Sequence, residues 1–259
     1  MKKLLVLLIT ILVGVLAAQA AAAAAAVPDR LNLEFWPEYD NGQVLFIGAV
    51  EYPANIPLPI EVKVAVPKGA NVTWSGEITG GPPSQDINVT PKVNPQADYD
   101  EVVFTLSKTR KGQVEAIWSG LKINGQDRSI NWDWVQRYEA KQVQFGFKAP
   151  SKSSSVTMTP ASAQVLKGQD KLDYYASAPL SLPVGGKQTF SVAYKRSAVG
   201  PSITPQQQQQ QFQEGAPGGT AAGSSGKSSS DILIYMFLLL TVGAVVFAVY
   251  NNKKKNARE

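Results

Sequence analysis

The residues best suited to chemistry stand in two short strings that contain tryptophan. In the first, Glu38 and Asp40 are two positions apart and adjoin Trp36 and Tyr39. If the chain is extended there, both carboxylates lie on one side, where paired acids can perform acid–base hydrolysis or bind calcium. We favour another interpretation, in which the acids close a turn before Asn41-Gly42 and the aromatic residues pack.

The second string, at residues 130–134, holds two tryptophans in alternation with polar residues. In a strand, Trp132 and Trp134 point to the same side, about 7 Å apart, as a platform for sugar rings requires. Asn131 and Asp133 would lie nearby as hydrogen-bonding groups. Because tryptophan is more often packed than exposed, we expect at least one of the two indoles to lie in the core.

The composition excludes several kinds of catalytic and metal site. The chain contains neither cysteine nor histidine. It therefore has no disulfide, no thiol or imidazole ligand for zinc or haem, and no Ser-His-Asp or Cys-His nucleophile system. We expect a non-enzymatic protein with no cofactor and no metal.

The net charge of +5 comes from the two ends of the chain. Lys2 and Lys3, with the last seven residues, hold six of the 25 Lys and Arg but only one of the 20 Asp and Glu. The rest of the chain is balanced, with 19 residues of each sign. Nothing in this distribution indicates nucleic-acid binding.

The N-terminus has the pattern of a secretory signal peptide, predicted at residues 1–20. Lys2 and Lys3 precede a thirteen-residue apolar run, 4–16, and Ala18-Gln19-Ala20 fits a small-x-small cleavage pattern. The alternative is an uncleaved anchor, although the run is short for a membrane span of roughly 20 residues.

The C-terminus predicts a single transmembrane helix. An uncharged apolar stretch begins at Ile232 and ends at Tyr250, and would be about 28 Å long as a helix. The basic tail 251–259 follows it, which places the tail in the cytoplasm and the preceding chain outside. Residues 197–230 are rich in Gln, Gly, Ser and Pro, as is typical of a disordered linker that tethers a domain to its anchor.

Between these ends the chain predicts an all-β fold, an antiparallel β-sandwich of immunoglobulin-like architecture. Short runs of alternating or continuous apolar residues lie between Gly, Pro and Asn breaks, at 43–52, 60–66, 102–106, 113–118, 142–147 and 188–194. We divide the region into a sandwich, 29–149, and a small β module, 150–196. A module of this size is marginal alone, so it should pack on the sandwich or complete its sheets.

The opening of this region resembles a group of uncharacterised bacterial cell-envelope proteins. The resemblance rests on the string 31–40, Leu-Asn-Leu-Glu-Phe-Trp-Pro-Glu-Tyr-Asp, and extends to about Gly69. Those proteins combine a signal peptide, a β-rich ectodomain and a C-terminal membrane anchor. The resemblance implies the same organisation here and no particular activity.

Three hypotheses follow. The first is a non-catalytic binding or assembly module of the cell envelope, held at the cell membrane with its C-terminus in the cytoplasm and contacting a protein partner. The second is a cell-surface glycan-binding protein that uses Trp132 and Trp134. The third, which we favour least, is a hydrolase that uses Glu38 and Asp40.

Overall fold

Apart from one short 3₁₀ turn, η1 (Pro83–Gln85), every regular element of the described chain is a β-strand. The structure is a computed structural model, and it describes residues 26–39, 42–168, 170–198 and 200–202. The predicted signal peptide, transmembrane segment and cytoplasmic tail lie outside these residues, as do Asp40 and most of the predicted linker. Within the described residues, no helix is long and apolar enough to cross a membrane.

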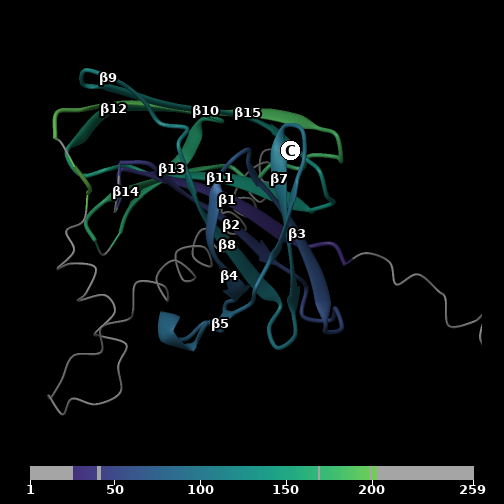
Figure 1. The fold of residues 1–259 in the computed structure, drawn as a ribbon. Helices are drawn as coiled ribbons and strands as arrows, with labels where there is room; N and C mark the ends of the chain where they lie inside the picture. The colour runs from purple at the N-terminus through teal and green to yellow at the C-terminus, as the bar shows by residue number, and fades with distance from the viewer. Residues whose placement is uncertain (1–25, 40–41, 169, 199, 203–259) are drawn as a thin grey trace, which may run out of the picture.

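The strands form one large sheet and two smaller ones (Figure 1). The large sheet has, in spatial order, β13 (Ser162–Lys167), β14 (Asp173–Ser177), β11 (Gln142–Lys148), β1 (Arg30–Pro37), β2 (Val44–Glu51), β8 (Lys111–Trp118), β4 (Asn71–Glu77) and β5 (Ile87–Asn88). A four-stranded sheet has the order β12 (Ser153–Thr159), β15 (Lys187–Arg196), β10 (Asp127–Val135) and β9 (Lys122–Asn124). A three-stranded sheet has β3 (Ile60–Pro67), β7 (Tyr99–Leu106) and β6 (Lys92–Pro95).

The prediction of an all-β fold built from antiparallel sheets is confirmed. Neighbouring strands pair antiparallel with one exception among the described strands, because β1 and β11 run parallel, with Leu33 opposite Phe145. All six predicted strand regions are strands, and the region predicted at 113–118 begins two residues earlier, at Lys111 of β8.

One hydrophobic core joins the three sheets. Phe35 on β1 stacks on Phe190 of β15 with ring centroids 4.1 Å apart, which links the large sheet to the four-stranded one. Gly48 on β2 faces β3 so closely that an added Cβ would lie 2.8 Å from Val64. Each fully buried aromatic or aliphatic side chain of this core contributes about 1.5–3 kcal/mol.

The strands between residues 150 and 196 are distributed over two sheets. β12 and β15 belong with β10, whereas β13 and β14 continue the large sheet beyond β11. Phe190, Val192 and Tyr194 lie in the same core as the strands of the first part. This region therefore completes two sheets that begin in residues 29–149.

The two ends of the described chain lie at opposite ends of β1. The first residues approach the start of that strand, where Lys141 donates a backbone hydrogen bond to Pro28. The last ones approach its finish, where the backbone N–H of Ser202 donates to the carbonyl of Glu38, 2.6 Å away. We call the end of the domain that contains Glu38 and Ser202 the exit end.

Candidate functional site

The two tryptophans of β10 face the interior. Trp134 is 2% exposed, and its indole N–H donates to Gln136, which is itself buried. Trp132 is half-buried and meets Trp134, Phe35 and Phe46 edge-on at 5.1–5.6 Å. The predicted same-side geometry is present, but it directs both rings toward the core, and the mutual tilt of 62° is not that of a flat platform.

Trp36 and Tyr39 belong to a buried polar cluster on the outer face of the large sheet, which we call the Lys148 cage. The Lys148 ammonium lies over three aromatic rings, with its nitrogen 3.9 Å from the centroid of Trp36, 4.1 Å from Tyr39 and 5.0 Å from Tyr174. It also forms an ion pair with Asp170. A cation held over ring faces is stabilised by their quadrupoles, most strongly when water is excluded.

Glu34 on β1 completes the cage beside Lys148, which lies on the neighbouring strand β11. Its carboxylate accepts a 2.8 Å hydrogen bond from the Trp36 indole. It packs against Gly146, where an added Cβ would lie 3.1 Å from the Glu34 side chain. Burial raises the pKa of Glu34 to about 7, although the Trp36 hydrogen bond and Lys148 act in the opposite direction. Burial also disfavours the charged form of Lys148 and so lowers its pKa, while the nearby Asp170 and Glu34 limit that shift.

A carboxyl and an amine whose pKa values move toward neutrality are typical of acid–base sites. Here, however, both side chains are almost wholly covered, at 5% exposure for Glu34 and 4% for Lys148. The ammonium is already occupied by three rings and a carboxylate. The arrangement therefore supports the fold, and the described residues leave no approach for a substrate to these two groups.

The Lys148 cage makes a pH-dependent contribution to stability. The Glu34 carboxyl has a pKa of 4.5 when unperturbed and about 7 when folded, so the folded state binds more protons between these values. The stabilisation is fully present below pH 4.5 and is lost as the pH rises through 7, by about 3 kcal/mol in total.

Glu34→Gln keeps the acceptor for Trp36 but cannot ionise. We expect the unfolding free energy of the parent to fall relative to this variant as the pH rises from 4.5 to above 7. Denaturant unfolding of both proteins over this range measures the difference. Parallel profiles would show that Glu34 ionises in the folded protein as easily as in the unfolded one.

Glu38 is the centre of a second buried cluster, which we call the Glu38 clasp. One carboxylate oxygen accepts a 2.8 Å hydrogen bond from Arg196 Nη1 and lies 3.5 Å from Arg128 Nε. The other accepts a 2.9 Å bond from the hydroxyl of Tyr194. The side chains of Glu38, Arg128 and Arg196 are only 6%, 7% and 1% exposed. Among the described residues, Arg128 Nε itself has no hydrogen-bond partner.

The Glu38 clasp joins distant parts of the chain at the exit end. Arg196 also donates to the carbonyls of Ser151 and Gly200, and Ser151 donates its N–H to the Ser202 hydroxyl. Glu38 adopts the left-handed conformation, with φ of 50°, where the chain turns between β1 and β2. Residues 200 and 202, which the sequence assigns to the linker, are thus bound to the folded domain.

The predicted acid pair cannot be assembled from the described residues. Glu38 is committed to two arginines and a tyrosine, and Asp40 lies outside the described residues. Within the described part of the chain, no three Asp or Glu side chains gather as metal ligands would. The favoured interpretation, in which Trp36 and Tyr39 pack, agrees with their ring contact at 5.0 Å, whereas the sequence did not indicate the arginines around Glu38.

The charged partners of both clusters were missed for an identifiable reason. Lys148, Asp170, Arg128 and Arg196 are distant in sequence from β1, and nothing local links them to it. Glu34 did carry a signal. Asn32, Glu34 and Trp36 alternate with Leu31, Leu33 and Phe35, which predicts a polar row on the far side of a core strand.

Comparisons with known proteins identify no family. No family model matches the chain, and no curated protein sequence matches it. Among solved structures, it is similar to native leukotriene A4 hydrolase from Saccharomyces cerevisiae, at 8% identity and a TM-score of 0.34. The match covers 66% of this chain and 29% of that enzyme, and a likeness this low carries no argument about activity.

Proposed function

We propose that this protein is a membrane-anchored, extracytoplasmic β-sandwich that acts as a non-catalytic binding or assembly module of the cell envelope. The proposal rests on the contacts that hold the chain at the exit end. The Glu38 clasp fixes the chain to the domain as far as Ser202. The stretch 203–231 and the apolar segment 232–250 follow directly. A domain fastened at one end to a tether and an anchor is suited to presenting its surface to a partner.

The commitment of the reactive residues supports a non-catalytic role. Glu38 is neutralised by arginine, Lys148 is enclosed by aromatic rings, and Trp134 lies in the core. Each of these groups stabilises the fold through contacts within the chain. The large apolar side chains that the described chain does expose lie on edge strands and in a loop, where a partner could contact them: Val93, Ile123, Val165 and Val184.

Crosslinking in native membranes tests the proposed role. The full chain should be recovered in detergent with one reproducible protein partner, and the same partner should be absent when the chain is replaced by an unrelated domain on the same anchor. Turnover of a substrate by the purified full chain would contradict the proposal. The geometry does not favour the glycan-binding alternative, because Trp134 is covered.

A further inference from the structure

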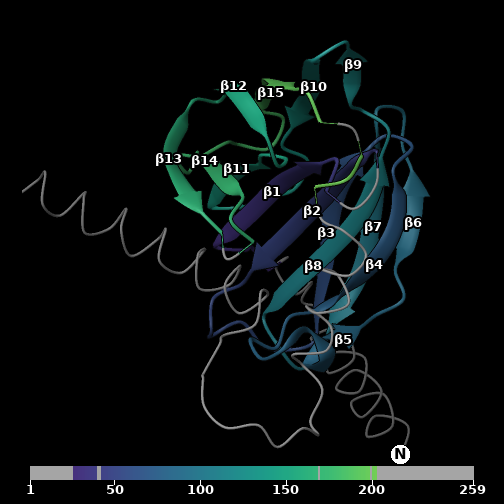
Figure 2. The ribbon, with the colours of Figure 1, turned by 90° about the vertical axis from the view of Figure 1, so that its left-hand side faces the viewer.

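The exit end carries a projecting hairpin beside the point where the chain leaves the domain. β9 and β10 are joined through Gly125, which has a φ of 59°, and residues 122–127 are all exposed. Figure 2 shows β9 at the outer limit of the molecule. The hairpin is hydrogen-bonded to the end of β15, because the N–H of Arg196 donates to the carbonyl of Gln126.

The hairpin presents an apolar side chain to solvent. Ile123 is 56% exposed, as exposed as any large hydrophobic residue in the described chain. On the strand next to it, Arg128 faces the Glu38 clasp. A single exposed isoleucine is ordinary on a protein surface. It indicates an interaction site only if the residues around it also favour one.

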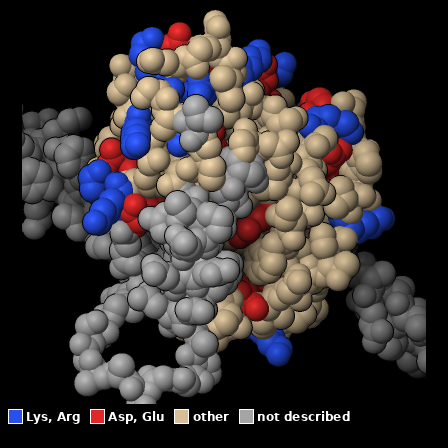
Figure 3. All heavy atoms as spheres, turned by 60° about the vertical axis from the view of Figure 1, so that its left-hand side comes forward, with Lys and Arg blue, Asp and Glu red and all other residues tan. Residues whose placement is uncertain are grey.

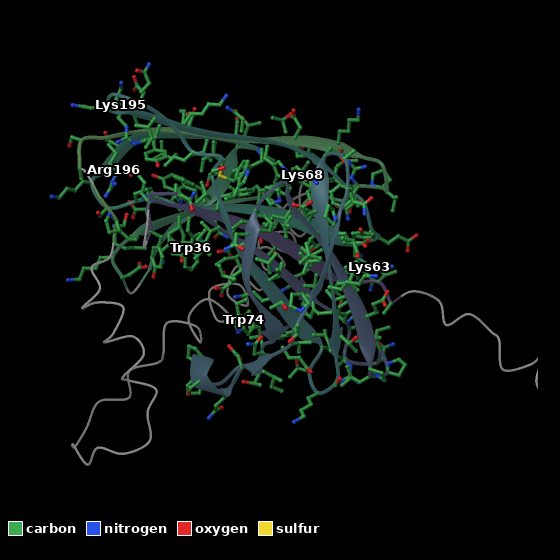
Figure 4. All side chains as sticks on the ribbon, viewed as in Figure 1. Trp36, Lys63, Lys68, Trp74, Lys195 and Arg196 are labelled. Carbon is green, nitrogen blue, oxygen red and sulfur yellow. The ribbon has the colours of Figure 1, made fainter. Side chains whose placement is uncertain are left out.

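Those surroundings are basic. Lys122, Lys152 and Lys195 are all exposed at the ends of neighbouring strands, and Asp127 pairs with Lys195 at 2.6 Å. Figure 3 shows basic side chains, interspersed with acidic ones, over the upper part of the molecule, and Figure 4 places Lys195 and Arg196 together at this end. The Glu38 clasp below adds two arginines against one carboxylate. The described residues of the exit end therefore carry an excess of positive charge.

We propose that the exit end lies against the anionic headgroup surface of the membrane that anchors the chain. Lys122, Lys152 and Lys195 contact lipid phosphates, and Ile123 enters the headgroup region. This inference rests on the proposed membrane anchoring. Only 29 residues, 203–231, separate Ser202 from the apolar segment 232–250, so the exit end is the part of the described domain nearest along the chain to the proposed anchor. Basic side chains beside an anionic leaflet are attracted to it within about a Debye length.

The opposite end of the same strands supplies a matched control. Val184 is also a branched aliphatic residue and is also 56% exposed. It lies in the loop before β15. In that loop the N–H of Gly185 donates to the carbonyl of Gln136, the first residue after β10. β15 has ten residues, so Val184 is about 30 Å farther from the proposed membrane surface.

The test uses the full chain in vesicles and depends on the absence of native cysteine. Ile123→Cys and Val184→Cys, each labelled with an environment-sensitive dye, are reconstituted in phosphatidylcholine vesicles with or without phosphatidylglycerol. Quenching by headgroup-labelled lipid should be at least about threefold stronger at position 123 than at 184 in anionic vesicles. It should fall toward the value at 184 in neutral vesicles, and also at 1 M salt, where the Debye length is about 3 Å.

A charge variant separates attraction by lysine from simple proximity. Adding Lys122→Gln, Lys152→Gln and Lys195→Gln to the Ile123→Cys protein should reduce its quenching to the value at 184. Equal quenching at both positions, or quenching unaffected by the lysine changes, overturns the inference. Flotation of the same vesicles monitors anchoring separately. Loss of flotation contradicts the proposed function as well, whereas retained flotation with equal quenching contradicts this inference alone.

Discussion

Glu38→Gln is expected to lower the free energy of unfolding by about 3–5 kcal/mol, because it removes a carboxylate that pairs with two buried guanidinium groups. Glutamine has nearly the same shape, so the loss reflects charge. Arg196 would stay 1% exposed beside Arg128 with carbonyl oxygens as its remaining partners. Leaving two buried positive charges without a counter-ion produces one of the largest losses of stability that a single substitution can cause.

Asp98→Asn is the control for this prediction. Asp98 pairs with Arg137 across the surface, and its side chain is 60% exposed. Exposed pairs contribute about 0–1 kcal/mol, so this variant should unfold close to the parent. Chemical denaturation of the three proteins at one pH provides the comparison. If Glu38→Gln is no more destabilising than Asp98→Asn, the Glu38 clasp does not hold the exit end together.

Trp134→Ala is expected to cost about 3–5 kcal/mol, the range for removing a large aromatic side chain from a core. The indole is 2% exposed and donates its N–H to Gln136, whose acceptor would then lose this partner in the interior. Trp132→Ala should cost less, because Trp132 is only half-buried, although it loses contacts with Phe35 and Phe46. Val184→Ala, on the surface, should remain within about 0.5 kcal/mol of the parent.

The same variants decide between packing and sugar binding. A thermal melt of each is set beside a polysaccharide pull-down of the parent, and we expect no retention of the parent. Retention that Trp132→Ala and Trp134→Ala abolish without lowering the melting temperature would establish the platform and contradict the packing described above.

The sequence predicted six of the fifteen described strands but not which strands would be neighbours in the sheets. Ile60, Val62, Val64 and Val66 alternate with largely polar residues, and this period-two signal identifies β3 without any tertiary information. Strand β12, Ser153–Thr159, has five Ser and Thr in seven residues, so its apolar pattern is too weak to predict a strand. It forms because β15 supplies a partner at both of its ends, with a shift in register between Ser154 and Thr157.

The candidate site was predicted only in part because its chemistry depends on long-range pairing. The parallel contact between β1 and β11 brings Lys148 beside Trp36, which is more than one hundred residues away in the chain. Glu38 and Arg196 are separated by 158 residues. An acid next to tryptophan suggested a reactive pair, whereas the folded chain supplies arginines that neutralise it.

Protease treatment of intact cells tests whether a C-terminal anchor holds the β-domain outside the cytoplasm. A tag is placed after Glu259, and a broad-specificity protease is added before and after the membrane is permeabilised. We predict release of a domain-sized fragment from intact cells by cleavage within 203–230, with the tag protected until permeabilisation. Protection of the domain with loss of the tag in intact cells would show that the domain lies in the cytoplasm and the C-terminus outside, which contradicts the proposed topology.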